Sequence, residues 1–358
     1  MSAHPAPISI FDGHNDFLLR LMNAPERRED IWLLGDGHGH LDLPRMKASG
    51  FAGGLFAIYV PSPGKAGALN SDALMAAPPY DLPLPEPVSH DAALAVAQAM
   101  AGHLMWMERA SGDAFRLCTT VGEIERARWD GAIAGVMHME GAEAIDAECD
   151  ELHTFYAMGL RSLGPVWSRP TVFGHGVPFR FPADPDTGPG LTEAGKRLIR
   201  ECNSLRVLVD LSHLNAKGFD DVAAISTQPL VATHSNAWAI TQSTRNLTDR
   251  QLGMIRDSGG MVGINFGTAF LREDGAKVAQ PTLDPLLRHL DYLITHLGEN
   301  GVGFGSDFDG TRVPEAIGDV TGLPDLMQAL ADHGINPDLL QKLAWDNWMG
   351  VLRRTWGA

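Results

Sequence analysis

Short apolar runs in this sequence repeatedly end in histidine and acidic residues. His14 and Asp16 follow the first such run, and Glu140, His213 and His234 each follow a later one. Three imidazoles and two carboxylates form a nitrogen and oxygen ligand set that suits zinc or another divalent first-row metal. Five ligands exceed the three of a mononuclear catalytic zinc, and a carboxylate such as Glu140 can bridge two ions about 3.5–4 Å apart. The predicted chemistry is hydrolysis by a water molecule that two metal ions activate.

Each of these residues has a simpler interpretation when it is taken alone. An H-x-D pair is a weak motif, because many such pairs are turn or capping residues. His213 or His234 could each be a core histidine bonded to the backbone. Several ionisable groups buried in one cavity are unfavourable, however, unless a cation neutralises them. Their joint placement therefore favours a metal site.

The residues that precede these polar side chains predict eight strands. The runs are mostly apolar throughout, which is typical of parallel strands buried on both faces. We expect the strands at residues 8–11, 54–60, 132–139, 160–166, 206–211, 230–233, 261–266 and 302–305.

Helical patterns fill the gaps between these runs. We expect helices at residues 91–109 (with Ser89 as the N-cap), 192–203, 247–256, 285–297 and 323–331, and two short helices within 337–356. Alternating strands and helices predict βαβ units, and eight units predict a TIM-like (β/α)8 barrel of the metal-dependent hydrolase type. An open doubly wound sheet is the alternative, because periodicity does not show closure. We expect a single catalytic domain over residues 1–358, with the C-terminal helices packed on the barrel.

Two stretches rich in proline and glycine interrupt this alternation. They are residues 61–87, after the second predicted strand, and residues 168–190, after the fourth. Both follow carboxyl ends of strands, where a barrel builds its active site. They are interpreted either as walls or lids of that site or as decoration of the rim.

The composition restricts the partners and the compartment. The formal net charge of −16 disfavours binding to nucleic acids or anionic membranes. The three cysteines, Cys118, Cys149 and Cys202, give no disulfide framework, which indicates a reducing compartment. Residues 1–7 lack the pattern of a signal peptide, and no apolar run is long enough to span a membrane. We therefore expect a cytoplasmic protein without nucleic-acid or membrane partners.

The motifs together resemble the membrane (renal) dipeptidase family of zinc metallopeptidases over about residues 12–353. They are D-G-H-N-D at 12–16, M-E-G at 139–141, D-L-S-H at 210–213, T-H-S-N at 233–236, R-N at 245–246 and G-x-G-S-D-F-D-G at 303–310. The resemblance implies the barrel of the amidohydrolase group and two zinc ions. It implies that His14 and Asp16 bind one ion, that His213 and His234 bind the other, and that Glu140 bridges them.

The resemblance also assigns two further roles, proton transfer and binding of the substrate's carboxylate. Asp307 matches the family's proton-shuttling aspartate, and a carboxylate beside two cations suits that task. Asp309 is the competing candidate, which we interpret as a turn residue before Gly310. Arg245 matches the arginine that binds the substrate's carboxylate, for which a guanidinium is suited. Considered by itself, Arg245 would be interpreted as a helix-entry or surface residue.

One position departs from the family pattern. Family dipeptidases carry a histidine after the fourth strand, and the alignment through residues 159–166 places Trp167 there. An indole donates one hydrogen bond but cannot carry a positive charge. His175, in the following loop, could take the histidine's place or could be a solvated loop residue. We predict that Trp167 and His175 contribute to substrate binding.

Three functional hypotheses follow. The first is a zinc-dependent dipeptidase for dipeptides with a free C-terminal carboxylate, including L,D-dipeptides, in a chain that could form homodimers as family members often do. The second is a metal-dependent hydrolase of other small amides or lactones, such as N-acyl amino acids, which Trp167 favours. The third is a metal-loaded barrel without catalysis, which Asp307 disfavours because a purely structural site does not need it. Zinc, manganese and cobalt share this ligand set.

Overall fold

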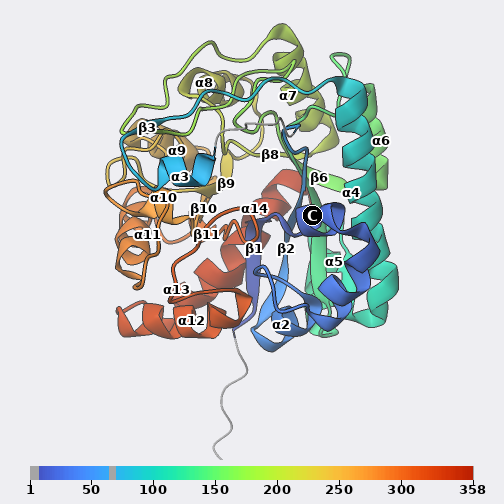
Figure 1. Ribbon diagram of the computed structural model, residues 1–358, viewed down its shortest axis with the longest axis vertical. Coiled ribbons are helices and arrows are strands. Elements are labelled where there is room, and N and C mark those ends of the chain that lie inside the picture. The colour runs from blue at the N-terminus through green and yellow to red at the C-terminus, as the bar shows by residue number, and fades with distance from the viewer. Residues whose placement is uncertain (1–7, 64–69, 358) are drawn as a thin grey trace, which may run out of the picture.

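A curled parallel sheet forms the centre of the computed structural model, which describes residues 8–63 and 70–357 (Figure 1). Residues 1–7, which carry the signal-peptide argument, and residues 64–69 of the first long loop lie outside the described residues. The main strands are β1 (Ile10–Asn15), β2 (Phe51–Tyr59), β5 (Ile133–Glu140), β6 (Leu160–Gly164), β8 (Leu208–Val209), β9 (Val231–Ser235), β10 (Met261–Ile264) and β11 (Val302–Phe304).

The sheet closes on itself. Its strand order is β8-β6-β5-β2-β1-β11-β10-β9, so neighbours in space follow one another in the chain once the order is read as a ring. A parallel bridge joins Asp210, directly after β8, to Val231 of β9, and the Leu211 N–H donates to the Val231 carbonyl at 2.8 Å. The predicted (β/α)8 barrel is therefore confirmed, and the open sheet is excluded.

All eight predicted strands are present, with shifted ends. The first continues through the polar motif to Asn15, and the fifth is reduced to two residues. Three short strands were not predicted: β4 (Phe115–Leu117), β3 (Tyr80–Asp81) and β7 (Arg180–Phe181). β4 pairs with the first half of β5, and β3 and β7 pair with each other within the two long loops. Runs of two or three residues are too short for a period to identify them.

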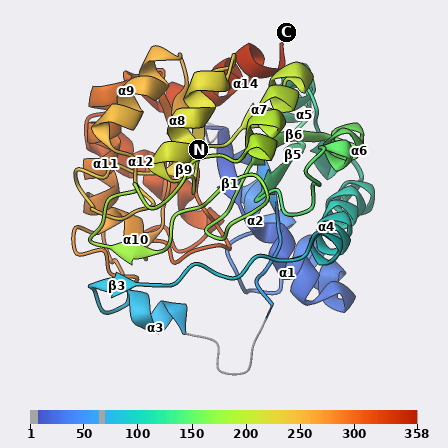
Figure 2. The same ribbon diagram turned by 90° about the horizontal axis from the view of Figure 1, so that it is seen from above.

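Helices surround the sheet (Figure 2). The predicted helices are found as α4 (His90–Ser111), α7 (Glu193–Leu205), α9 (Asp249–Asp257), α11 (Asp284–Leu297) and α12 (Leu323–Asp332). Thr192 and Thr248 cap α7 and α9 with their side chains, whereas Ser89 precedes α4 without a side-chain cap. The remaining α-helices are α1 (Phe17–Asn23), α2 (Leu43–Ala48), α3 (Ser71–Met75), α5 (Val121–Trp129), α6 (Asp150–Met158), α8 (Ala216–Ile225) and α10 (Thr268–Leu271). Shorter turns are η1 (Pro25–Arg27), η2 (Asp30–Leu34), η3 (Gly112–Ala114) and η4 (Val320–Gly322).

The C-terminal segment covers the amino-terminal end of the barrel. It consists of α13 (Pro337–Gln341), η5 (Lys342–Asp346) and α14 (Asn347–Trp356), which agrees with the two predicted short helices. The Trp345 and Trp348 rings lie 6.0 and 5.9 Å from the ring of Phe11, near the start of β1. The Trp348 indole donates to the Phe304 carbonyl at 2.9 Å. With this end covered, the polar groups at the carboxyl ends of the strands lie at the other end of the barrel.

No helix among the described residues is long and apolar enough to cross a membrane.

Candidate metal centre and active site

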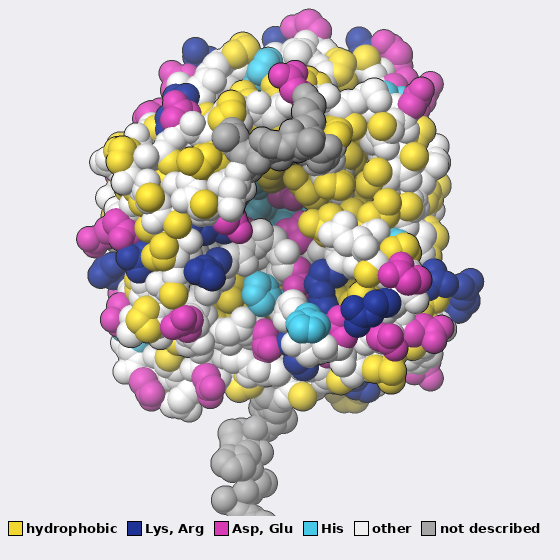
Figure 3. Space-filling view, viewed as in Figure 1, with side chains coloured by type: hydrophobic (Ala, Val, Ile, Leu, Met, Phe, Trp, Pro, Cys, Tyr) yellow, Lys and Arg dark blue, Asp and Glu magenta, His cyan; other side chains and the backbone are white. Residues whose placement is uncertain are grey.

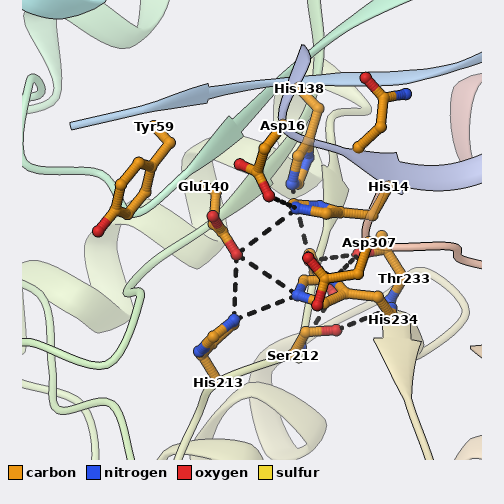
Figure 4. A network of polar contacts seen from close by, with 12 residues as sticks. His14, Asp16, Tyr59, His138, Glu140, Ser212, His213, Thr233, His234 and Asp307 are labelled. Carbon is orange, nitrogen blue, oxygen red and sulfur yellow. Dashed lines mark hydrogen bonds and ion pairs between the residues drawn. The ribbon is translucent and has the colours of Figure 1, made fainter. Parts of the chain in front are cut away.

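Three predicted histidine ligands surround one oxygen atom of Glu140, the last residue of β5, and Asp16 lies beside one of them (Figure 4). Glu140 Oε1 lies 3.0 Å from His213 Nε2, 3.4 Å from His234 Nε2 and 3.7 Å from His14 Nε2. Asp16 Oδ2 lies 3.4 Å from the same nitrogen of His14. The five residues come from β1, β5 and β9 and from the segments directly after β1 and β8, because parallel strands present their carboxyl ends at one mouth.

The donor set fits divalent cations. Two groups of potential ligands have atoms within 4.8 Å of one another, and both include His14. One group adds Glu140 and His234, and the other adds Asp16 and Asp307. His14 is fully buried, and its ring nitrogens have no hydrogen-bond partner among the described residues. Buried polar atoms are rarely left unpaired in proteins. Two adjoining clusters of imidazole and carboxylate atoms would satisfy these nitrogens by binding metal ions.

The pKa shifts of the buried cluster also bear on metal binding. Burial lowers the pKa of His213 and of His234 well below the usual value, and nearby cationic groups lower both further, so both imidazoles are neutral. Burial raises the pKa of Glu140 well above its usual range, and the Asp16 carboxylate raises it further. Burial alone would lower the pKa of His14, but Glu140 and Asp16 raise it to about 10. His213 and His234 therefore offer lone pairs to a cation, and a bound cation would displace the protons that the raised pKa values leave on His14 and Glu140.

Hydroxyl groups behind the histidines fix which nitrogen faces the cluster. Thr233 Oγ1 donates its single hydrogen to Asp210 Oδ2 at 2.6 Å. It therefore accepts from His234 Nδ1, which lies 2.8 Å away, so that the Nε2 lone pair faces Glu140. Ser168 Oγ lies 3.2 Å from His213 Nδ1 in the equivalent place. Such outer contacts orient metal-binding imidazoles. Sequence reasoning did not assign these residues, although Asp210 and Thr233 belong to the quoted motifs.

Asp307 lies beside the cluster in a constrained turn after β11. Its N–H donates to the His14 carbonyl at 3.0 Å, and Asn265 Nδ2 donates to its Oδ2 at 2.9 Å. Its backbone has a φ of 58°, which is unfavourable for a non-glycine residue and is common at functional sites. Burial raises the pKa of Asp307 to about 6. The carboxylate is thus held by an amide and could accept a proton.

Asp309 also lines the cavity, but its hydrogen-bond partners differ from those of Asp307. Its Oδ1 accepts the His40 N–H at 2.6 Å, and its own N–H donates to His40 Nδ1 at 2.8 Å. Its side chain therefore holds the loop before α2 against the end of β11. This arrangement agrees with the interpretation of Asp309 as a turn residue.

Arg245 lies in the loop after β9 and is buried, contrary to a surface location. Its Nη2 donates to the His234 carbonyl at 3.2 Å, and its Nε has no hydrogen-bond partner among the described residues. Burial lowers the pKa of Arg245, while Asp307 and Glu140 act in the opposite direction. A buried guanidinium with an unused donor can bind a carboxylate.

One cavity of about 990 Å³, which opens on the face shown in Figure 3, is lined by Asp16, Glu140, His213, Arg245 and Asp307. Both long loops contribute to its walls, through residues 62–63, 82–87, 167–168 and 178–179. The first loop is tied across the mouth, because Tyr80 donates to the Gly275 carbonyl at 3.0 Å and Lys277 pairs with Asp72 at 2.7 Å. These contacts support the interpretation of both loops as walls of the site.

Of Trp167 and His175, the two residues predicted to contribute to substrate binding, only Trp167 lines the cavity. Trp167 is half-buried and lines the cavity. His175 is not among the described residues that line it, and its carbonyl accepts the Asn215 N–H at 3.4 Å. The structure therefore does not bring His175 into the place of the family's histidine. Three lining aromatic residues, Tyr59, Phe179 and Phe270, were not predicted.

Comparisons with known proteins identify the family. Residues 5–356 match the family model of membrane dipeptidase, peptidase family M19. The chain belongs to this family. Membership confirms the predicted resemblance and the class of metallo-dipeptidase, and it implies a divalent metal at the site.

Solved structures agree with the family assignment. A dipeptidase described as a metallo peptidase of family M19 has a TM-score of 0.96 and 63% identity, with 99% of this chain and 100% of that chain covered. A metallo peptidase from Rhodobacter sphaeroides, solved with a phosphinate mimic of the dipeptide L-Ala-D-Ala, also has a TM-score of 0.96 and 63% identity, covering 98% and 100%.

A curated relative is similar in sequence but carries no stated activity. An uncharacterised protein encoded in the pqqA 5′ region of Klebsiella pneumoniae is 51% identical over 69% of this chain and 91% of that protein.

Proposed function

We propose that this protein hydrolyses the amide bond of dipeptides that have a free C-terminal carboxylate, including dipeptides with a D-residue at the second position. The observation that carries the proposal is that three histidines face one oxygen of Glu140, that Asp16 lies beside His14, and that Arg245 and Asp307 lie in the same cavity. The Rhodobacter sphaeroides peptidase, which holds an L-Ala-D-Ala mimic, supports the inclusion of L,D-dipeptides.

We assign the metal ligands as the family resemblance implies. His14 and Asp16 would hold one zinc ion, His213 and His234 the other, and Glu140 both. Bound there, the ions would lower the pKa of a water molecule and polarise the scissile carbonyl. The unpartnered nitrogens of His14 and the neutral state of His213 and His234 support this assignment.

The remaining groups act on the substrate and on protons. Arg245 would bind the terminal carboxylate, because it is buried in the cavity wall with an unused donor. Asp307 would take a proton from the attacking water and deliver it to the leaving amine. Asn265 would hold the Asp307 carboxylate in place through the contact at Oδ2. These three residues would thus orient the substrate and move the proton.

A direct assay tests the proposal. The purified protein is analysed for bound metal, loaded separately with zinc, manganese and cobalt, and supplied with L,L- and L,D-dipeptides. We expect hydrolysis that a chelator abolishes and that added metal restores. A fully metal-loaded protein that cleaves none of these dipeptides would falsify the proposed function.

Trp167 favours a second candidate function, hydrolysis of N-acyl amino acids, other small amides or lactones. An indole cannot supply the positive charge of a protonated imidazole at this wall of the cavity. Turnover of N-acetyl amino acids is therefore compared with turnover of dipeptides that share the same C-terminal residue. A larger kcat/KM for the N-acetyl compounds would favour this second function.

We further propose that the protein is a single catalytic domain in the cytoplasm, without nucleic-acid or membrane partners. Three cysteines that are buried and not joined in disulfides support a reducing compartment. A net charge of −16 opposes binding to polyanions. A homodimer follows from the resemblance alone, and light scattering during gel filtration tests it.

A further inference from the structure

Four aromatic rings form a continuous wall along the catalytic cavity, which we call the aromatic arc: Tyr59, Trp167, Phe179 and Phe270. Ring centroids are 5.2 Å apart for Tyr59 and Trp167, 5.7 Å for Trp167 and Phe179, and 6.3 Å for Phe179 and Phe270. All four line the cavity. The arc ends at Arg245, whose Cζ lies 5.5 Å from the Phe270 ring centroid. The wall therefore runs from the predicted carboxylate anchor to the end of β2.

A buried arginine supports the far end of the arc. Arg169 is fully buried, and its Cζ lies 5.7 Å from the Tyr59 ring and 5.5 Å from the Trp167 ring. It pairs with Glu143 at 2.6 Å and donates to Ser62 Oγ at 2.8 Å. These contacts tie together the segments that follow β2, β5 and β6. The two rings are thus a fixed surface, preorganised for contact with a ligand.

The reaction centre lies beside the middle of the arc. The His213 ring is 6.0 Å from Trp167 and 6.4 Å from Phe179, measured between centroids. Tyr59 pairs in register with Glu140 and lies beside it (Figure 4). A dipeptide whose carboxylate is bound by Arg245 and whose carbonyl is at the metal ligands places its amino-terminal residue beyond them. That position is the Tyr59–Trp167 end of the arc.

We propose that Tyr59 and Trp167 form the subsite for the side chain of the amino-terminal residue, and that the enzyme prefers large apolar side chains there. This inference rests on the proposed dipeptidase function. Half-exposed rings on a cavity wall lose contact with water when an apolar side chain packs on them, which favours binding. This subsite would explain why the chain has Trp167 where the family has a histidine, because an imidazole would interrupt the apolar surface.

The test compares two substrate series with a single position varied in each. In the first, Gly, Ala, Leu or Phe precedes D-Ala, and in the second, L-Ala precedes D-Ala, D-Leu or D-Phe. We expect the wild type to cleave Leu-D-Ala and Phe-D-Ala with a kcat/KM about tenfold or more above that of Gly-D-Ala, since a few methylene groups discriminate to this extent. Trp167→Ala should remove most of this ratio and leave the ratios in the second series unchanged.

Two further variants make the test specific. Trp167→Phe keeps a smaller ring and should restore part of the first-position preference. Phe181 is in β7, packs 6.1 Å from Tyr80 and is not among the described residues that line the cavity, so Phe181→Leu is the matched control and should change neither ratio. Metal content is measured for each variant, so that a loss of folding is recognised.

The outcomes separate this inference from the proposed function. If the wild type cleaves no dipeptide, the proposed function fails and the inference fails with it. If it cleaves Gly-D-Ala and Leu-D-Ala equally well, only the subsite is excluded. A Trp167→Ala effect confined to the second position would likewise overturn the assignment of this wall to the amino-terminal residue.

Discussion

The Nε2 atoms of His213 and His234 lie 3.1 Å apart, and both face Oε1 of Glu140. Two neutral imidazoles come this close without repulsion when one donates to the other or when a cation lies between their lone pairs. The Thr233 hydroxyl, which already donates to Asp210, requires the hydrogen of His234 on Nδ1, so His234 Nε2 offers a lone pair either to an N–H of His213 or to a cation. The outer hydroxyl therefore prepares His234 for a metal ion.

Thr233→Val tests this role of the hydroxyl. Valine keeps the volume of the fully buried side chain but removes the acceptor for His234 Nδ1 and a donor to Asp210. We expect metal affinity to fall about 10–100-fold, as for other outer-layer partners of metal-binding histidines. Competition with a fluorescent zinc chelator measures the affinity. Thr233→Ser keeps the hydroxyl and should bind metal nearly as well as the wild type, and equal affinity of Thr233→Val would contradict the assignment.

Asp307→Asn should separate proton transfer from metal binding. The variant keeps the shape of the side chain but cannot accept a proton, so kcat should fall by about 10²–10⁴. The five assigned ligands are unchanged, so metal analysis should find the wild-type content. Asp309→Asn is the control in the same turn, because Oδ1 can still accept from His40. Its kcat should stay within a few-fold of the wild type, and a larger loss there than at Asp307 would reverse the two roles.

Arg245→Met should weaken recognition of the substrate's carboxylate. Losing a buried charge-assisted contact costs about 2–4 kcal/mol, which corresponds to a fall in kcat/KM of roughly 30- to 1,000-fold. The matched substrate is the same dipeptide with a C-terminal amide. Wild-type kcat/KM should drop on this amide, whereas the variant should treat acid and amide alike. A variant that still prefers the free acid would place the carboxylate elsewhere.

The barrel and the meeting of its polar residues could be predicted because both depend on local pattern and parallel topology. His14, Glu140 and His234 each end an apolar run, and parallel strands bring such ends to one mouth. His175 follows no predicted strand directly, and it does not line the cavity although other residues of its loop do. Loop paths depend on particular contacts, such as the Asn215 N–H to the His175 carbonyl, that no periodicity reveals.

The aromatic arc could not be predicted for a related reason. Tyr59 ends β2, Trp167 follows β6, Phe179 precedes β7 and Phe270 belongs to α10. Their rings become neighbours only after four separate segments fold over the mouth. Arg169, which supports the far end, is an arginine in a loop and would ordinarily be placed in solvent. Burial of its charge is possible because Glu143 neutralises it.

The buried environment of His289, on α11, predicts how the free energy of unfolding depends on pH. Its Nδ1 accepts the Ala237 N–H at 3.1 Å, and its Nε2 lies 3.2 Å from the Leu271 carbonyl, so the buried ring is neutral and supports the segment that leads to Arg245. Burial lowers the pKa of His289 to about 3. Below pH 6.5 the unfolded chain therefore binds a proton at this ring, whereas the folded chain does not bind it until about pH 3. The free energy of unfolding consequently falls as the pH is lowered from about 6.5 to about 3.

The expected size follows from the same shift. Between pH 6.5 and pH 5 this residue should remove about 2 kcal/mol from the free energy of unfolding. Urea denaturation of the metal-loaded protein at several pH values measures the loss. His289→Gln cannot titrate, so its stability should be lower at neutral pH but should decline less on acidification. His153, whose side chain is 56% exposed, provides the control for replacing a histidine at the surface by glutamine. Equal slopes for the wild type and His289→Gln would show that the ring is protonated in the folded state.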